Sequence, residues 1–544
     1  MRAADLLARR LHEAGCRHAF GMPGGEVLVI VDALERAGIA FHLVAHENAG
    51  GFIAEGVHHM QAAGEGGTFA PAILVGTIGP GILNAVNTVA NAWQDRVPMI
   101  VLAGCVDRDE ALTYTHQVLD HERVLAPVTK ATFRLTARGA GIVADKAVAI
   151  ALEGRAGPVF IDVPIGVAGA EVASASQPPR EPHRAPPAPL VPAREDLETA
   201  RAWLRHAERP VVVAGLDAVR DGAGAALQRF CERLGAPLVT TYKAKGIVPE
   251  AHPLALGGAG LSPLADRHVL PLLERADVVV LAGYDPIEMR AGWREPFGRA
   301  RVIDIAHEAN RHYMHQGDLN FVAHVGRTLD LLLPDDGRAP WDADTRTALR
   351  AAFPDDDDWG PAAVIAECRA VLPDDTIATV DSGAHRILLS QMWTTHAPRT
   401  LLQSSGLCTM GCAVPLAIGA KLAMSAKLAA PERPVVAFTG DGGMLMVAGE
   451  LATAARLGLA PVVVVFVDRS LALIEMKQRN VQLGEAGVDV GAHDFAALGR
   501  AMGGAGETVR SRPRLRAALE AALARDTFTV IAAEIEPGGY DGRI

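Results

Sequence analysis

Short, continuous runs of apolar residues recur along the chain and are separated by segments with helical periodicity. They include AILVGT (72–77), PMIVLAG (98–104), PVVVAG (210–215), DVVVLAGY (277–284), PVVAFTG (434–440) and PVVVVFVD (461–468). Apolar runs of this length, without polar alternation, are typical of strands that helices cover on both faces. The pattern therefore predicts an α/β fold with mainly parallel sheets.

Two changes in composition divide the chain. Residues 176–196 are rich in proline, which predicts an extended linker, and residues 334–361 are acidic and interrupted by proline and glycine. A chain of 544 residues is long enough for several domains. We predict three domains, at 1–175, 190–333 and 360–544, each a mainly parallel sheet with helices on both faces.

The overall composition restricts the class of protein. Hydrophobic residues make up 49% of the chain, which excludes wholesale disorder, and the net charge of −11 argues against a nucleic-acid partner. Six dispersed cysteines do not form a disulfide framework, and Cys408 and Cys412 lack a second ligand pair for zinc, so we predict small buried thiols. The N-terminal segment has the pattern of a helix rather than a signal peptide, and no run approaches the ~18 apolar residues of a membrane span. We expect a cytoplasmic protein without a membrane partner.

The most informative cluster of polar residues follows the apolar run at 434–440. Asp441, Gly442 and Gly443 lie between this predicted strand and a predicted helix over 444–458, where backbone amides suit a phosphate group. The next strand ends at Asp468, and two carboxylates with a backbone carbonyl can bind Mg²⁺ together with phosphate oxygens and water. Taken alone, the pattern is equally compatible with a glycine turn and two solvated aspartates.

Nearly the whole chain, about 1–170 and 195–540, resembles the thiamine diphosphate (ThDP) enzymes of the acetolactate synthase-like group, which includes 2-oxo acid decarboxylases and pyruvate oxidase. The resemblance is carried by the GDG segment above and by GMPGGEVLVIVDAL, AHENAGGFIAEG and GTIGPGILNAVNTVANAWQDRVPMIVLAG. It implies ThDP and Mg²⁺ as cofactors, with Asp441, Asp468 and the Ser470 carbonyl as metal ligands. The family signature has an asparagine pair where this chain has Val467 and Asp468.

On the first domain, the resemblance assigns the catalytic carboxylate to Glu47. In the family this carboxylate faces the aminopyrimidine ring and promotes loss of the thiazolium C2 proton. Outside such a motif, a lone glutamate at a helix start is usually a surface residue. The resemblance also implies a pyrimidine pocket with contributions from Pro23, Gly25, Gly79, Pro80, Gly81 and Asn84.

On the third domain, DSGAH (381–385) resembles the loop on the diphosphate side, with Ala384 in place of a frequent glutamine. SSGLCTMGCAVPLAIGAKLA (404–423) resembles the element that places a methionine beneath the cofactor, although a methionine in an apolar stretch is ordinarily core packing. The implied cofactor contacts here are His385, Cys408, Met410, Asp441, Gly442, Gly443, Asp468 and Leu471. In this family Glu47 and the GDG segment meet across a subunit interface, so the resemblance implies a homodimer or homotetramer.

Several departures from acetolactate synthases lie on the substrate side. His116 and Gln117 stand where synthases often have Phe-Gln, and His116 is either a substrate contact or proton donor, or a structural histidine. Lys477 stands where many synthases have tryptophan, and it either binds a carboxylate or phosphate or is a surface lysine. GYDPIEMR (283–290) is closer to the flavin-independent synthases, so we expect no FAD.

These features predict an enzyme that decarboxylates a 2-oxo acid and ligates the acyl carbanion to a second carbonyl compound. A decarboxylase that protonates this carbanion, with His116 as the candidate acid, is the nearest alternative, and a flavin-dependent oxidase similar to pyruvate oxidase is a third. Intact Glu47 and Asp441 argue against an inactive cofactor-binding protein. A dinucleotide-dependent dehydrogenase would need a GxGxxG motif with a downstream ribose carboxylate, which the sequence lacks.

Overall fold

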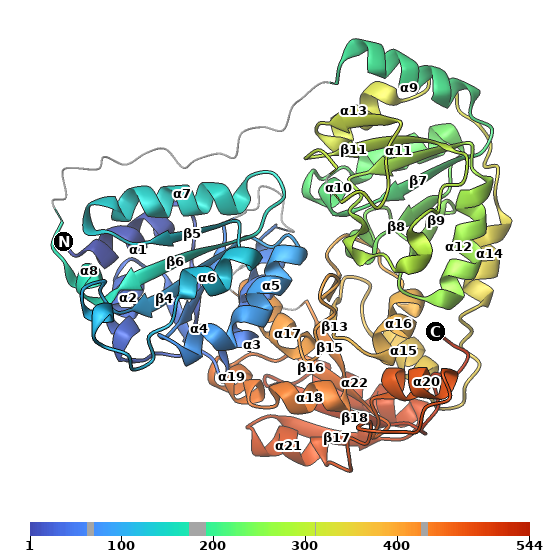
Figure 1. Cartoon of the computed structure of the whole chain (residues 1–544). Helices are drawn as coiled ribbons and strands as arrows, with labels where there is room; N and C mark the ends of the chain where they lie inside the picture. Colours follow the sequence, from blue (N-terminus) through green and yellow to red (C-terminus); the bar gives the residue numbers. More distant parts are fainter. Residues whose placement is uncertain (63–69, 173–191, 311, 426–432) are drawn as a thin grey trace.

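The computed structural model describes residues 1–62, 70–172, 192–310, 312–425 and 433–544. The described chain forms three domains, each built on a six-stranded parallel sheet with helices on its faces (Figure 1). The predicted fold class is confirmed. Most of the predicted proline-rich linker, residues 176–191, lies outside the described residues.

The N-terminal sheet has the strand order β2-β1-β3-β4-β6-β5. Its strands are β1 (His18–Gly21), β2 (Ala40–Leu43), β3 (Ala72–Gly76), β4 (Met99–Cys105), β5 (Ala131–Arg134) and β6 (Pro158–Pro164). Its α-helices are α1 (Ala3–Glu13), α2 (Leu28–Arg36), α3 (Glu47–Ala62), α4 (Pro80–Asn84), α5 (Val86–Gln94), α6 (His121–Leu125), α7 (Ala140–Leu152) and α8 (Ile165–Gly169).

The C-terminal sheet repeats this arrangement, with the order β14-β13-β15-β16-β18-β17. Its strands are β13 (Ile377–Val380), β14 (Leu401–Gln403), β15 (Val435–Gly440), β16 (Val462–Val467), β17 (Ala505–Val509) and β18 (Thr529–Glu534). Its helices are α15 (Pro361–Val371), α16 (Ala384–Met392), α17 (Ala413–Ser425), α18 (Asp441–Val447), α19 (Glu450–Arg456), α20 (Ala472–Asn480), α21 (Phe495–Ala501) and α22 (Arg512–Leu523). Counted within each domain, both sheets have the order 2-1-3-4-6-5, so equivalent loops can be compared directly.

The central sheet has a different order, β12-β11-β10-β7-β8-β9, which is the doubly wound order of dinucleotide-binding folds. Its strands are β7 (Pro210–Ala214), β8 (Leu238–Thr240), β9 (Ala255–Gly258), β10 (Val278–Ala282), β11 (Arg301–Ala306) and β12 (Leu319–Val322). Its helices are α9 (Arg194–His206), α10 (Leu216–Arg220), α11 (Gly224–Leu234), α12 (Pro263–Arg275), α13 (Val325–Leu332) and α14 (Asp344–Ala351). Helix α14 lies within the acidic segment 334–361 and buries Leu349 in a core of this domain. The domain boundaries at 1–175, 190–333 and 360–544 stay predictions.

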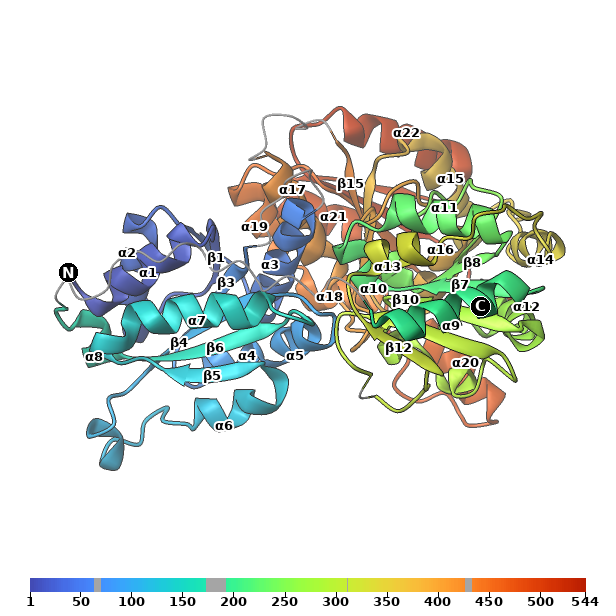
Figure 2. The same cartoon turned by 90° about the horizontal axis from the view of Figure 1, so that it is seen from above.

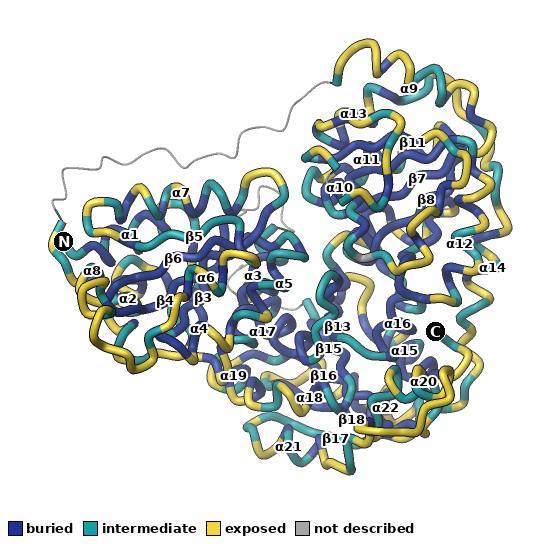
Figure 3. Tube along the Cα trace, viewed as in Figure 1, coloured by how far each residue is buried: buried dark blue, intermediate teal, exposed yellow. Residues whose placement is uncertain are grey.

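The apolar runs form strands because both faces of each sheet are covered. In β10, Val278 and Val280 pack into one hydrophobic core, whereas Val279 and Leu281 pack into a second core on the opposite face. Figure 3 shows that the inner strands of the three sheets are buried and that the helices around them are more exposed. Alternate residues of a strand point to opposite faces, so two covered faces require an unbroken apolar run.

Helices α3 and α17 join the N-terminal and C-terminal domains by direct backbone contact (Figure 2). A Cβ atom at Gly56 would lie 2.3 Å from the Leu416 carbonyl oxygen, and one at Gly419 would lie 2.0 Å from the Ile53 oxygen. Glycine at these two positions therefore permits the close approach. The hydrophobic core around the contact contains residues from both domains.

Within the described residues, the helices are too short or too polar to span a membrane.

Candidate active site

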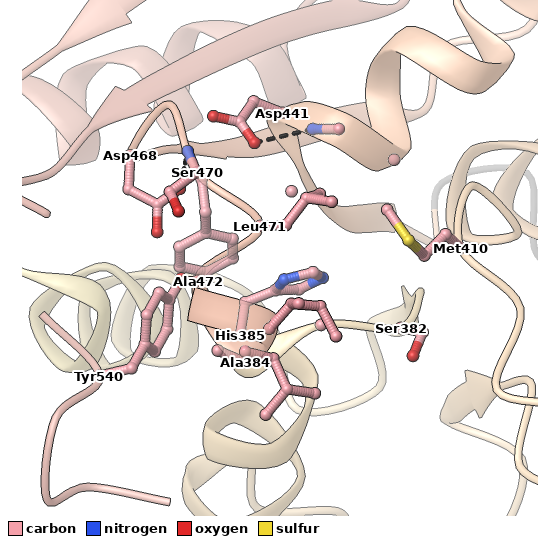
Figure 4. Close-up of a pocket in the computed structure, with 17 residues that line it drawn as sticks. Ser382, Ala384, His385, Met410, Asp441, Asp468, Ser470, Leu471, Ala472 and Tyr540 are labelled. Carbon is pink, nitrogen blue, oxygen red and sulfur yellow. Dashed lines mark hydrogen bonds between the residues drawn. The ribbon is translucent and has the colours of Figure 1, made fainter. Parts of the chain in front are cut away.

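A pocket of about 110 Å³ lies at the carboxyl ends of β13, β15 and β16 (Figure 4). These strands are parallel neighbours, so the loops that follow them meet at one edge of the sheet. His385 follows β13, Asp441 follows β15 and Asp468 follows β16. The topology thus brings together three predicted site residues that are separated widely in sequence.

The Asp441 and Asp468 carboxylates are held by the tight turn after β16. One oxygen of Asp441 accepts a hydrogen bond from the Gly442 amide at 2.7 Å, and its other oxygen accepts one from the Arg469 amide at 2.7 Å. Asp468 accepts a hydrogen bond from the Ser470 amide at 3.2 Å. Arg469 has φ of 61°, which is uncommon for a residue with a side chain and reflects the sharpness of this turn.

The electrostatics of this carboxylate pair suit a divalent cation. Burial raises the pKa of Asp441. Burial, followed by the negative charge of Asp441, raises the pKa of Asp468 to about 7. Two buried carboxylates that disfavour each other's charge are stabilised by a hard cation bound between them. The described residues contain no cluster of three or more His, Cys, Asp or Glu side chains suited to a metal, so further ligands would have to be backbone, phosphate or water oxygens.

Asp381, which the sequence analysis quoted without giving it a role, organises the floor of the pocket. One oxygen of its fully buried carboxylate contacts Nε2 of His385 at 2.8 Å. The other oxygen accepts hydrogen bonds from the Gly411 amide at 2.7 Å and the Thr439 hydroxyl at 2.8 Å. Asp381, directly after β13, therefore contacts both the segment between β14 and α17 and the end of strand β15. Its position directly after β13 was the available sequence signal.

All but one of the remaining predicted cofactor contacts of this domain line the pocket, and the exception is Cys408. Met410, Gly442, Gly443, Ser470 and Leu471 line the pocket, with Met410 on the side opposite Asp468 (Figure 4).

Cys408 is not among the described lining residues of this pocket. It is partly exposed, contrary to the expectation of a buried thiol, whereas Cys412 is buried as expected. Cys408 adopts φ of 54°, and Arg386 donates a hydrogen bond to its sulfur at 3.1 Å.

Tyr540 lines the same pocket and was missed by the sequence analysis. Its ring lies beside Asp468 in Figure 4. Burial raises the phenol pKa well above its usual value, and the charges of Asp468 and Asp441 add to the shift. Its distance from the recognisable motifs leaves no sequence signal for this position.

The helix predicted over 444–458 is divided at residues 448–449, which corrects that prediction. Helix α18 ends at Val447, and α19 begins at Glu450. A Cβ atom at Gly449 would lie 3.1 Å from the Ala45 side chain, so the break lies where the chain meets the N-terminal domain. Glu450, which is buried, accepts hydrogen bonds from the amides of Ala45 and His46, both at 3.0 Å.

Glu47 is the first residue of α3, and its side chain is buried. One carboxylate oxygen accepts a hydrogen bond from the Asn84 amide group at 3.0 Å. The other oxygen lies 3.2 Å from the position that a Cβ atom at Gly81 would occupy, so glycine leaves the carboxylate accessible to the Gly79-Pro80-Gly81 turn. The structure thus brings Glu47, Gly81 and Asn84 together.

The turn at Gly79 is hydrogen-bonded to a buried histidine, His121, that the sequence analysis missed. Gly79 has φ of 66° and donates its amide hydrogen to Nε2 of His121 at 3.2 Å. The other ring nitrogen of His121 contacts Asp162 at 3.0 Å. An accepting Nε2 places the ring proton on Nδ1, so this histidine is a donor to Asp162. The carbonyl of Gln117 lies against Gly79, which places Gln117 at the same turn.

His116 and Pro23 lie on exposed loops of the N-terminal domain, and Gly25 is exposed at the start of a short 3-10 helix (Gly25–Val27). The described residues that line the Asp441 pocket all belong to the C-terminal domain, and Glu47 is not among them. One chain therefore carries two separate groups of site residues, one on each of its two related sheets.

The two flanking domains and the central domain each match a known sequence family. The family described as "Thiamine pyrophosphate enzyme, N-terminal TPP binding domain" matches residues 1–124, the corresponding central domain matches 197–332, and the C-terminal TPP binding domain matches 381–533. The chain belongs to the thiamine pyrophosphate enzymes.

Full-length relatives of this thiamine pyrophosphate enzyme include several acetolactate synthases. It is 30% identical over 531 residues to acetolactate synthase of Bacillus subtilis (strain 168), covering 94% of this chain and 90% of that protein. It is 31% identical over 490 residues to the acetolactate synthase isozyme 1 large subunit of Escherichia coli (strain K12), covering 87% and 83%. A protein named "Probable 2-ketoarginine decarboxylase AruI" from Pseudomonas aeruginosa is 30% identical over 554 residues, covering 97% and 93%.

These similarities confirm the recognised family and the class of enzyme. The protein is a ThDP-dependent, acetolactate synthase-like enzyme of the carboligase and decarboxylase class.

Proposed function

We propose that this protein decarboxylates a 2-oxo acid and ligates the remaining acyl group to the carbonyl carbon of a second molecule. The observation that supports the proposal is that one chain carries two groups of predicted ThDP-site residues, one on each related sheet: Glu47 with its turn, and the Asp441 pocket. In the net reaction the donor loses its carboxyl group as CO₂, and a new carbon–carbon bond forms to the acceptor. Bound ThDP supplies the nucleophilic carbon and takes up the electron pair released with CO₂.

The chemistry of the donor set fits Mg²⁺ and a diphosphate. Asp441 and Asp468 provide hard oxygen ligands, and the Ser470 carbonyl is our candidate for a third. Gly442, Gly443 and His385 surround the space where the diphosphate would bind. Leu471 and Met410, which line the pocket, would provide apolar contacts for the thiazolium ring.

On the N-terminal domain, Glu47 would hold a proton against the aminopyrimidine ring. Its burial and its hydrogen bond from Asn84 fix the carboxylate in one orientation. The Gly79-Pro80 turn, Pro23 and Gly25 would complete the pyrimidine pocket. Gln117, which lies against Gly79, and its chain neighbour His116 are candidate substrate contacts.

We propose that a second copy of the chain completes the site, in a homodimer or a homotetramer. Glu47 and the Asp441 pocket are separate within one chain, and large apolar side chains near both groups are exposed. They include Leu28, Leu83, Leu445, Met446 and Ile474. Exposed apolar surface of this kind marks an interaction site.

Mixing two inactive variants tests this interface. Copies with Glu47→Gln and copies with Asp441→Asn each lack one half of every site. After unfolding and refolding together in equal amounts, half of the dimers are mixed, and each of these has one intact site, so about a quarter of wild-type activity should return. A mixture that stays inactive would place both halves of the site in the same chain.

The reaction itself is tested by product analysis with pyruvate after reconstitution with ThDP and Mg²⁺. Acetolactate as the product supports carboligation. Acetaldehyde alone would support the decarboxylase alternative, which the similarity to the Pseudomonas decarboxylase also favours. Absence of CO₂ release would move the search to other 2-oxo acids.

We expect no FAD in the central domain. At the switch point between β7 and β10, where dinucleotides bind in such sheets, the two following loops are in direct contact. The Asp217 amide donates to the Gly283 carbonyl at 3.1 Å, and a Cβ atom at Gly283 would lie 2.3 Å from the Ala218 nitrogen. The Asp217 carboxylate in the first turn of α10 would also repel a diphosphate. A flavin absorption band in the purified protein would refute this expectation.

The six free cysteines are compatible with a reducing cytoplasm, which is the location we propose.

A further inference from the structure

Two buried carboxylates make reciprocal contacts between the N-terminal and C-terminal domains. Glu450, at the start of α19, accepts the amide hydrogens of Ala45 and His46, the two residues that precede Glu47. Asp95, at the end of α5, accepts the amide hydrogens of Gly406 at 2.8 Å and Ser405 at 3.2 Å. Each carboxylate thus binds two consecutive backbone amides of the other domain.

The two contacts involve corresponding elements of the two domains. Each carboxylate belongs to the helical segment after the third strand of its domain: Glu450 is the first residue of α19, and Asp95 directly follows the last residue of α5. The amides that they bind both lie in the loop that follows the second strand of the opposite domain, β2 or β14. One loop continues into Glu47, and the other continues to Met410 in the pocket.

The Asp95 contact is reinforced from the central domain. Nζ of Lys243 lies 3.0 Å from Asp95 and 3.9 Å from Glu55, and these three side chains are almost fully buried. Asn91 donates a hydrogen bond to Glu55 at 2.9 Å and accepts one from the Ser404 hydroxyl at 2.5 Å. The loop before Met410 therefore contacts the N-terminal domain directly, and Lys243 of the central domain contacts the Asp95 carboxylate that binds this loop.

We propose that Glu450 and Asp95 are matched positioning residues, Glu450 for the segment that carries Glu47 and Asp95, with Lys243, for the loop that carries Met410. The proposal rests on the ThDP site described above. A buried charged acceptor with two donors holds a backbone segment more firmly than neutral contacts do. We call the contacts of Glu450 and Asp95 with these backbone amides the two clamps. The Glu450 clamp holds the segment of the proposed proton-transferring residue, and the Asp95 clamp holds a loop of the cofactor pocket, so their loss should affect different measurements.

The test compares Glu450→Ala with Asp95→Ala in the full chain. Hydrogen–deuterium exchange should be at least tenfold faster at 45–46 in Glu450→Ala and at 405–406 in Asp95→Ala, since each variant loses hydrogen bonds to a charged acceptor. In ThDP titrations at saturating Mg²⁺, Asp95→Ala should raise the Kd about tenfold, whereas Glu450→Ala should leave it within twofold and instead lower kcat about tenfold.

Controls separate positioning from general stability. Glu450→Gln keeps an oxygen acceptor and should restore most of the exchange protection and kcat, and Asp109→Asn changes an exposed carboxylate and should change nothing. Lys243→Met should shift ThDP affinity in the same direction as Asp95→Ala. If Asp95→Ala does not fold, Ser404→Ala is the milder substitution and should raise the Kd by a smaller factor.

The outcomes also distinguish this proposal from the proposed reaction. Exchange and ThDP titrations do not require turnover, so they report on the clamps whatever the substrate. Variants that lower only the melting temperature, with unchanged amide exchange, ThDP affinity and kcat, would overturn the positioning roles. Failure of the wild-type protein to bind ThDP with Mg²⁺ would instead refute the proposed site.

Discussion

The N-terminal and C-terminal sheets have the same strand order but present different chemistry at the same edge. After the third strand, the N-terminal domain has the Gly79-Pro80-Gly81 turn, whereas the C-terminal domain has Asp441, Gly442 and Gly443. The N-terminal group of site residues contains one buried carboxylate, Glu47, which accepts a hydrogen bond from the Asn84 side-chain amide. The C-terminal group contains two carboxylates, and burial, followed by the charge of Asp441, raises the pKa of Asp468.

This difference shows how the surroundings of a carboxylate determine what it can do. Glu47 accepts a hydrogen bond from one side chain, and we propose that it exchanges a proton with a heterocycle. Asp441 accepts two backbone amides and lies beside a second carboxylate, which suits a metal ion. The related topology supplies the equivalent positions, and the residues on the loops give each position its role.

The largest effect should come from Glu47→Gln. The substitution keeps the side-chain size but removes the proton-transferring group, so the rate of CO₂ release should fall by about 10²–10⁴. ThDP affinity should stay within a few-fold of wild type. Glu520→Gln, an exposed glutamate on α22, is the matched control. Full activity of the Glu47 variant would assign the proton transfer to another group.

The corresponding substitution in the C-terminal domain, Asp441→Asn, should lower cofactor retention rather than the rate of proton transfer. Asp441→Asn removes the charge of a proposed metal ligand, so Mg²⁺-dependent ThDP retention should fall about 10- to 100-fold, as measured by dialysis against chelator. Asp468→Asn relieves the repulsion between the two carboxylates and should retain ThDP much better. Equal retention in Asp441→Asn and wild type would refute the metal assignment.

The contact that joins the two domains predicts an effect on stability. Gly419→Ala places a methyl group 2.0 Å from the Ile53 oxygen, so α3 and α17 must separate. We expect a loss of about 1–3 kcal/mol in the free energy of unfolding. Gly169→Ala, where a Cβ atom meets nothing within 4 Å, is the control. A Gly419 variant as stable as this control would show that the interface repacks freely.

The smallest effect should come from Lys477→Ala. Lys477 is exposed and lies one helical turn after Leu473, which lines the pocket. If it binds a substrate carboxylate, the KM for acceptors with an additional carboxylate should rise about two- to fivefold, as expected for an exposed ion pair. The KM for pyruvate serves as the internal control. An identical change for both substrates would leave Lys477 as a surface residue.

The sequence was most informative where local patterns determine structure. Two-sided burial produces continuous apolar runs, so strands such as β10 and β16 and the α/β class were predictable. The GDG and GPG segments marked both halves of the site because tight turns need glycine, as Gly79 with its positive φ illustrates. The prediction of one helix over 444–458 was wrong, because the helix is interrupted at residues 448–449, where Gly449 faces Ala45 of the other domain.

The sequence by itself determined the family, the fold class and the residues that carry the proposed chemistry, because short local motifs and apolar runs are enough to specify them. Only the tertiary structure decided which distant groups meet: Asp381 with His385, His121 beneath Gly79, Tyr540 beside Asp468, and the Glu450 and Asp95 clamps. The physical reason is that a buried polar group must find its partner in three dimensions, and no local pattern specifies which chain segment provides it.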